Sequence, residues 1–231
     1  MKLHWSPDSA NLVVRMALHG FEMDYEGVRL NRAEADHKSP GYLRLNPRGL
    51  IPVLEDGDVV LFETGAILLH LAEKAGRFGP SGPETEERAA RAAFTRWLFF
   101  LSNTIHGEML MGFYTPRYTD EAGIPAVQAA VARRLTEHLS LIEANLPVQG
   151  GLAGPAGLLE IYLGCLIRWS QLYGAKAHRL PGLEPWPRLH LLMSNLEDRI
   201  FVRDAAAAER IPPQPFTRPK RPDVPRSEIT G

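Results

Sequence analysis

The chain contains a single cysteine, Cys165, and this scarcity excludes several kinds of chemistry. One cysteine cannot form an internal disulfide, a CxxC redox pair or a cysteine-based metal cluster, so we predict no metal site and no dithiol oxidoreductase. Long apolar runs are also absent, which predicts no transmembrane helix, and the N-terminus lacks the apolar core of a secretory signal. These absences fit a reducing cytoplasm best.

The chain also lacks an excess of charge of either sign. Its 26 Lys and Arg residues and 27 Asp and Glu residues give a formal net charge of -1. Without a basic excess, we predict neither nucleic acid nor an anionic membrane surface as a partner. The length of 231 residues allows one large domain or two ordinary ones, and the composition, 45% hydrophobic and 23% charged, is ordinary for a globular protein.

The first eighty residues alternate strand and helix patterns. We expect strands at 2–5 and 23–30, a hairpin at 51–62 that turns at 56–58, helices at 12–18 and 64–74, and a loop at 32–45 with one helical turn after Pro40. Side chains of Asp8, Ser9 or Asn11 are the expected caps of the first helix. The order β-α-β followed by β-β-α predicts one parallel and one antiparallel pairing in a small α/β domain.

After Gly79–Pro83 the pattern becomes helical, with expected helices at 84–113, 124–146, 158–173, 187–197 and 200–209 and no strand. We therefore divide the chain into an α/β domain (1–78), a linker (79–85), an all-helical domain (86–210) and a Pro-rich tail (211–231). Because closely spaced prolines forbid helix and sheet, we expect the tail to run extended or disordered, as a solvated tail or alternatively as an interaction motif.

Segment 46–67, NPRGLIPVLEDGDVVLFETGAI, holds two unusual features. Pro52 stands at the mouth of an apolar strand, although proline cannot donate to a sheet ladder. Glu63 and Thr64 open a helix, where a carboxylate, a hydroxyl and free N–H groups can recognise a charged ligand. An edge-strand proline and a helix cap explain each feature singly. Together, at this spacing, they predict a binding site.

The segment resembles the cytosolic glutathione transferases through NPRGLIPVL and the following LFETGAILLHLAEK. The resemblance implies a thioredoxin-like N-terminal domain, a helical-bundle C-terminal domain and glutathione as substrate. It also implies a cis bond before Pro52 and main-chain pairing of Ile51 with the cysteinyl part of glutathione. Glu63 and Thr64 would hold the γ-glutamyl end.

A second match, His37-Lys38-Ser39-Pro40, is similar to a stretch of the phi-class enzymes. That resemblance implies that His37 and Lys38 bind the glycine carboxylate of glutathione, and two cations beside a carboxylate make chemical sense. An exposed polar loop is the alternative. The chain departs from the phi pattern at Leu50, where that class carries a glutamine.

We expect the groups that activate the glutathione thiol in the loop 5–11. The thiolate is the nucleophile, and a free thiol has a pKa of about 8.5, so the protein must supply donors near a helix N-terminus. Ala10 stands where the similar beta class has cysteine, and Ser9-x-Asn11 looks like the Thr-Pro-Asn of the nu class. We predict Ser9 as the first thiolate donor, Asn11 as the second and Ser6 as the third. Helix capping is the alternative role.

The end of the first long helix carries the expected second-substrate pocket. In the family this helix lines the cleft facing the thiol, and an apolar lining with a few polar groups suits a small hydrophobic electrophile. Bundle core and dimer contact are the alternative roles. The candidates are Asn103, His106, Met109, Phe113 and Tyr114.

Two features of the third helix of this domain complete the interpretation. Gly157 stands where the family usually has a capping Ser or Thr, although Glu160 can still reach back to the helix start. Cys165 lies among apolar residues, which predicts a buried, inert thiol.

The resemblance implies a homodimeric glutathione transferase that binds glutathione and activates its thiolate for attack on a hydrophobic electrophile. Two alternatives remain open. One is a glutathione-dependent disulfide or peroxide reductase that uses no enzyme cysteine, and the other is a non-catalytic glutathione-binding protein on the same fold.

Overall fold

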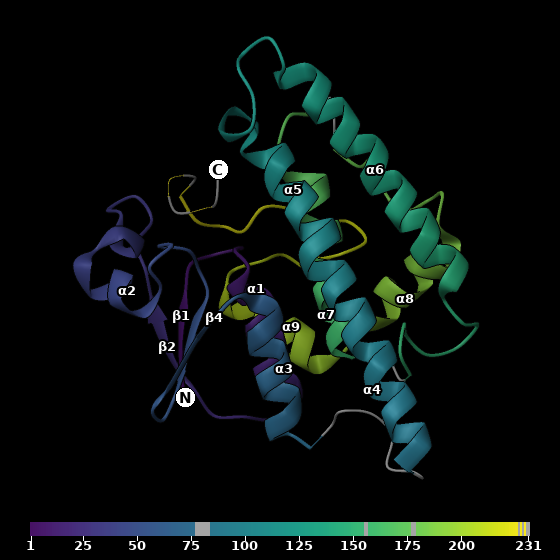
Figure 1. Cartoon of the computed structure of the whole chain (residues 1–231), viewed down its shortest axis with the longest axis horizontal. Coiled ribbons are helices and arrows are strands. Elements are labelled where there is room, and N and C mark those ends of the chain that lie inside the picture. The colour runs from purple at the N-terminus through teal and green to yellow at the C-terminus, as the bar shows by residue number, and fades with distance from the viewer. Residues whose placement is uncertain (77–83, 155–156, 177–178, 226, 228, 230–231) are drawn as a thin grey trace. The chain divides into compact units, whose positions relative to one another are not determined.

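The computed structural model describes residues 1–76, 84–154, 157–176, 179–225, 227 and 229 (Figure 1). The chain forms two units. Unit 1 contains Met1–Arg77, Asp198–Pro213 and Lys220–Gly231, and unit 2 contains Phe78–Glu197 and Gln214–Pro219. Unit 1 thus includes a late helix that the sequence-based division assigned to the helical domain. The predicted linker at 79–85 lies largely outside the described residues.

Unit 1 is built on a four-stranded sheet with the order β2-β1-β3-β4. β1 pairs in parallel with β2, and β3 pairs antiparallel with β4, as predicted. The antiparallel pairing of β1 with β3, which joins the two halves of the sheet, was not predicted. The hairpin turns at Gly57, whose φ of 65° is a conformation that glycine adopts without steric cost. The strands are β1 (Lys2–Trp5), β2 (Glu26–Arg29), β3 (Val53–Asp56) and β4 (Val59–Phe62).

The helices of unit 1 are α1 (Asn11–Gly20), α2 (Pro40–Leu45), α3 (Thr64–Lys74) and α9 (Ile200–Ala208), with a 3-10 helix, η1, at Asp36–Lys38. α1 packs against β1, α3 and α9, which explains why residues 11–18 are buried on every side (Figure 1). Ala10 occupies the N-cap of α1 and no side chain caps the helix. The predicted capping by Asp8, Ser9 or Asn11 is therefore wrong. The Ser9 and Asn11 side chains bond elsewhere.

Unit 2 is helical, and its described residues contain no named strand, only an isolated bridge between Gly151 and Gly154. The predicted helix 84–113 is continuous but has a π-helical middle. None of the described helices is long and apolar enough to cross a membrane. The helices are α4 (Glu84–Phe99), the π-helix η2 (Phe100–Ile105), α5 (His106–Phe113), the 3-10 helix η3 (Thr115–Arg117), α6 (Ile124–Asn145), α7 (Leu158–Leu172) and α8 (Pro187–Glu197).

α7 forms the buried core of unit 2. At its start the Glu160 carboxylate accepts the Gly157 N–H at 2.6 Å and the Leu152 N–H at 2.7 Å, so Glu160 reaches back to the helix start as predicted. Cys165 is fully buried and forms no disulfide, which confirms the predicted burial.

Part of the Pro-rich tail is docked, so the expectation of a solvated tail is wrong there. Phe216 is fully buried, and its ring covers Gly164, where an added Cβ would lie 3.0 Å from the ring. The Glu197 carboxylate accepts the N–H groups of Phe216 and Thr217, both at 3.1 Å. Proline prevents regular structure but leaves an aromatic residue free to anchor the chain by burial.

Candidate active site

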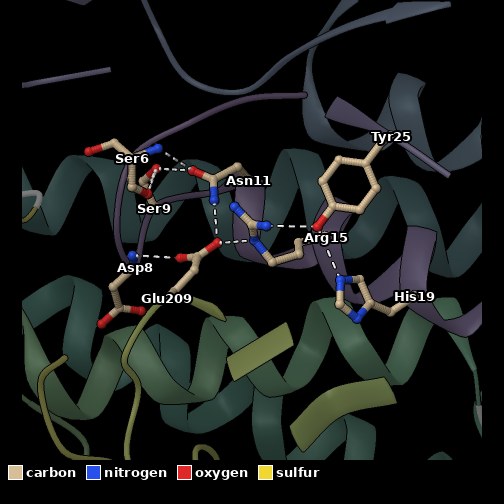
Figure 2. A network of polar contacts seen from close by, with 8 residues as sticks. All are labelled: Ser6, Asp8, Ser9, Asn11, Arg15, His19, Tyr25 and Glu209. Carbon is tan, nitrogen blue, oxygen red and sulfur yellow. Dashed lines mark hydrogen bonds and ion pairs between the residues drawn. The ribbon is translucent and has the colours of Figure 1, made fainter. Parts of the chain in front are cut away.

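The loop between β1 and α1 turns its polar groups toward one another (Figure 2). The Asn11 side-chain oxygen, Oδ1, accepts the Ser6 N–H at 3.0 Å and lies 2.5 Å from the Ser9 hydroxyl. That hydroxyl also lies 3.0 Å from the Ser6 carbonyl oxygen, which is a second acceptor for its single proton. Polar groups of this loop therefore bond to one another around Ser9.

Asn11 is fully buried, and both ends of its amide have protein partners. Its Nδ2 donates to Oε1 of Glu209 at 2.7 Å, while Oδ1 receives Ser6 and Ser9. These partners fix the orientation of the amide. Ser9 keeps 7% of its surface exposed. Of the three side chains predicted to approach a sulfur, Asn11 and Ser6 are thus fully buried, and Ser9 is the one with exposed surface.

Glu209 and Arg15 complete a buried network that we did not predict from the sequence (Figure 2). The second Glu209 oxygen, Oε2, accepts the Asp8 N–H at 2.9 Å, and Oε1 accepts Arg15 Nε at 2.8 Å. Arg15 Nη1 donates to the Tyr25 hydroxyl at 2.7 Å, and the guanidinium lies 4.4 Å from the Trp5 ring centroid. The network therefore reaches from the loop to Tyr25, directly before β2.

Burial raises the pKa of the Glu209 carboxyl to about 7, although the Arg15 guanidinium and the Asp8 N–H favour its ionised form. Asp8 itself has a φ of 51°, in the left-handed region that aspartate tolerates better than most residues. The Glu209 carboxylate thus holds the main chain at the most constrained point of the loop.

The residues before Pro52 present a free main-chain edge. The Ile51–Pro52 bond is cis, as the resemblance implied. The Leu50 carbonyl oxygen accepts from the Tyr42 hydroxyl at 2.7 Å and from Asn46 Nδ2 at 2.8 Å, which fixes the preceding turn. Within the described residues the Ile51 main chain makes no hydrogen bond, so it can pair with a peptide ligand as an added strand would.

The pair Glu63 and Thr64 lies at the start of α3. Glu63 has a φ of 72°, and its carboxylate is 57% exposed and 2.6 Å from Arg48 Nη1. Thr64 is buried as the first residue of the helix. No side chain caps α3, so its first N–H groups are available to an anion.

His37 and Lys38 differ in charge. Burial, together with the neighbouring Arg32 and Lys38, lowers the pKa of His37, so this ring is neutral near pH 7. The expectation of two cations is thus reduced to one. Lys38 Nζ lies 3.2 Å from the carbonyl oxygens of Arg48 and Gly49, which places its charge beside the loop that leads to Ile51.

The five second-substrate candidates lie on η2, on α5 and directly after α5. Met109 and Phe113 line a small cavity of about 20 Å³, room for about one water molecule, together with Ser170 and Tyr173. Asn103 is exposed on η2, and Tyr114 stacks 4.2 Å from the Arg117 guanidinium. Neither lines that cavity.

His106 bonds inside unit 2. Its Nδ1 lies 2.8 Å from the Tyr162 hydroxyl, and its ring packs against Tyr162 and Trp169. The residue as a whole is only half-buried, but these rings cover the imidazole, and burial lowers the pKa of His106 to about 4. It is a neutral ring at physiological pH.

Comparisons with known proteins agree with this architecture. The glutathione S-transferase N-terminal domain family matches residues 1–73. Glutathione S-transferase 3 of Zea mays is 33% identical over 220 residues, covering 93% of this chain and 97% of that protein. The glutathione S-transferase from Xylella fastidiosa superposes with a TM-score of 0.76 at 25% identity, covering 90% of this chain and 98% of that one. A sphingomonad glutathione S-transferase complexed with glutathione gives 0.72 at 27% identity, with coverage of 90% and 98%.

The fold is a thioredoxin-like sheet domain followed by a helical region. It is therefore the fold of the glutathione S-transferase structures that superpose on this chain. The sequence match to the Zea mays enzyme covers nearly the whole length of both chains, so it shows the family and not only the fold. The chain belongs to the glutathione S-transferase family, a family of transferases.

Proposed function

We propose that this protein binds glutathione in unit 1 and activates its thiolate for attack on a small hydrophobic electrophile. The observation that carries the proposal is the free main chain of Ile51 at a cis proline, one short hairpin from the uncapped start of α3. Such an edge recognises peptide main chain, and such a helix start recognises a carboxylate. The sphingomonad relative was solved with glutathione in the complex.

The γ-glutamyl end of glutathione carries an ammonium and a carboxylate. We assign the ammonium to Glu63, where it displaces or shares the Arg48 contact, because that ion pair is exposed and readily exchanged. Thr64 and the first N–H groups of α3 receive the carboxylate. Ile51, next to Pro52, pairs with the cysteinyl main chain. The Lys38 ammonium forms an ion pair with the glycine carboxylate of glutathione.

His37 completes this end of the site. Because the pKa of His37 is lowered, we propose that its neutral imidazole donates an N–H hydrogen bond to the glycine carboxylate.

At the thiol end we propose Ser9 as the direct donor. Its proton now faces Asn11 Oδ1 and the Ser6 carbonyl oxygen, so the hydroxyl rotates toward the sulfur when glutathione binds. Asn11 acts through Ser9, and the N–H groups at the start of α1 add a favourable dipole. The thiol proton leaves to solvent, and the sulfur electron pair forms a C–S bond with the electrophilic carbon. In a substitution the leaving group departs from that carbon with its bonding electron pair, and in an addition the displaced π electrons take up a proton from solvent.

We propose that the second substrate contacts residues of α5 and its ends. Met109 and Phe113 provide apolar side chains there, although the cavity beside them has room for only about one water molecule. Asn103, His106 and Tyr114 provide the few polar groups. We further propose a cytoplasmic homodimer, since family sites lie beside a two-fold interface. Light scattering at the mass of one chain would contradict the dimer.

Calorimetric titration tests the function. We expect saturable binding of glutathione and of S-methyl glutathione, because the main-chain edge and the ion clamp do not touch the sulfur. Glutathione disulfide serves as a third ligand that shares the γ-glutamyl end. Absence of binding by all three would contradict the proposal.

A further inference from the structure

We propose that Glu209 is a positioning residue for thiol activation, which holds the loop on both sides of Ser9. This inference rests on the proposed function and adds a residue that the match of residues 1–73 does not contain. Glu209 follows α9, and it lies 198 positions from Asn11 along the sequence. Both residues belong to unit 1.

The two carboxylate oxygens have separate tasks (Figure 2). Oε2 accepts the Asp8 N–H at 2.9 Å, immediately before Ser9. Oε1 accepts Asn11 Nδ2 at 2.7 Å, two residues after it. One buried carboxylate therefore bridges the loop across Ser9. Because the Asn11 amide is oriented from behind, its Oδ1 faces the Ser9 hydroxyl at 2.5 Å.

Arg15 makes this carboxylate compatible with a nearby thiolate. A lone buried anion would repel a second anion, but Arg15 Nε lies 2.8 Å from Glu209 Oε1 and balances its charge. Arg15 is itself held by the Tyr25 hydroxyl at 2.7 Å and by the Trp5 ring. Where Glu209 is ionised, the pair can thus fix geometry without adding net charge to the site.

The competing explanation is that Glu209 merely stabilises the fold. Glu197 is the matched control, because it is likewise buried and its carboxylate likewise accepts main-chain N–H groups. Its donors are Phe216 and Thr217 in the C-terminal segment, and all three residues belong to unit 2. A general loss of stability should follow from changes at either glutamate.

The test uses Glu209→Asp, Glu209→Gln and Glu197→Asp in the full chain. Glu209→Asp keeps the charge opposite Arg15 but withdraws the carboxylate. Glu209→Gln keeps the size but replaces one acceptor by a donor that faces either the Asp8 N–H or the Asn11 amide. The readout is the thiolate ultraviolet absorbance of bound glutathione against pH, with circular dichroism to verify folding and S-methyl glutathione to measure sulfur-independent binding.

We expect both Glu209 variants to raise the pKa of the bound thiol by about one unit, which is about ten-fold less thiolate at a pH below both values. Their affinity for S-methyl glutathione should stay within about two-fold of wild type, since that ligand needs no thiolate donor. Glu197→Asp should leave the thiol pKa unchanged. Should Glu209→Asp not fold, the near-isosteric Glu209→Gln decides alone.

Two results overturn the inference in distinguishable ways. If wild type lowers the thiol pKa and a folded Glu209 variant lowers it equally, Glu209 positions nothing and the proposed function stands. If wild type binds neither glutathione nor S-methyl glutathione, the proposed function fails and the role of Glu209 fails with it.

Discussion

The two ends of the proposed glutathione site hold their polar groups in opposite ways. At the thiol end, Asn11 and Glu209 are buried and bonded to other parts of the protein. At the γ-glutamyl end, Glu63 is exposed and pairs with the exposed Arg48. The thiol end is therefore organised before the ligand arrives, whereas the clamp completes its bonds with the ligand.

This difference follows what each end has to do. A donor aimed at a developing or stabilised anion acts best when its geometry is fixed in advance. A clamp for an ammonium and a carboxylate gains from exposure, because the ligand must enter and leave. The buried Arg15–Glu209 pair and the exposed Arg48–Glu63 pair should therefore respond very differently to the loss of one partner.

The largest expected effect contrasts these two ion pairs. Glu209→Ala leaves the Arg15 guanidinium buried without its carboxylate, and we expect the free energy of unfolding to fall by about 3–5 kcal/mol. Glu63→Ala breaks an exposed pair and should cost at most about 1 kcal/mol. Urea unfolding followed by circular dichroism measures both. Equal losses would remove the distinction between the two ends.

A second prediction uses pH to isolate Glu209. Burial raises its pKa from the ordinary 4.5 to about 7, so the folded protein binds this proton more tightly than the unfolded chain does. Its contribution to stability is fully present below about pH 4.5 and is lost as the pH rises through about 7. Arg15 and Asp8 are the charged groups that face it.

Relative to Glu209→Gln, wild type should therefore lose up to about 1.4 kcal/mol of stability per pH unit between about pH 5 and pH 7. Urea unfolding of both proteins at three pH values in this range measures the slope. A difference in unfolding free energy that is constant with pH would show that Glu209 does not titrate there.

The third prediction concerns the clamp. Glu63→Gln removes the charge opposite the proposed ammonium, and we expect the glutathione Kd to weaken about 10–100-fold, as for the loss of a charged hydrogen bond. Stability should hardly change, because the side chain is exposed. Calorimetry supplies the Kd, and Val60→Thr on the neighbouring strand serves as a surface control. Unchanged affinity in Glu63→Gln would place the ammonium elsewhere.

The smallest expected effect is at Ser9. Ser9→Ala removes one hydrogen bond to the thiolate, which should raise the pKa of the bound thiol by at most about one unit. The affinity for S-methyl glutathione should stay at the wild-type value, the reverse of the pattern expected for Glu63→Gln. A loss of S-methyl glutathione binding in Ser9→Ala would mean that the two ends are not separable.

The two ends of the proposed site also differ in how much of each could be predicted from the sequence. The hairpin and α3 at Thr64–Lys74 follow from residues close together in the chain, and the structure agrees with them. The cis bond before Pro52, which the family resemblance of the same stretch implied, is also present. The motif of the clamp lies within that same stretch. Turn chemistry and helix periodicity act locally, so sequence alone carries them.

The network behind the thiol loop is not local. Glu209 lies at the end of an alanine-rich helix and carries no sequence signal for its partner 198 positions away. Arg15, a charge inside the apolar run LVVRMAL, is the one visible sign that a buried counter-charge is required. The docking of Phe216 was missed for a similar reason, because composition describes the tail but not the Gly164 surface that receives it.

The most direct test of the account is the pH titration of glutathione bound to the wild-type protein, followed by thiolate absorbance. A thiol held by Ser9 at the start of α1 should titrate at least about one unit below the free value of about 8.5. A bound thiol that titrates at the free value would contradict thiol activation at this loop.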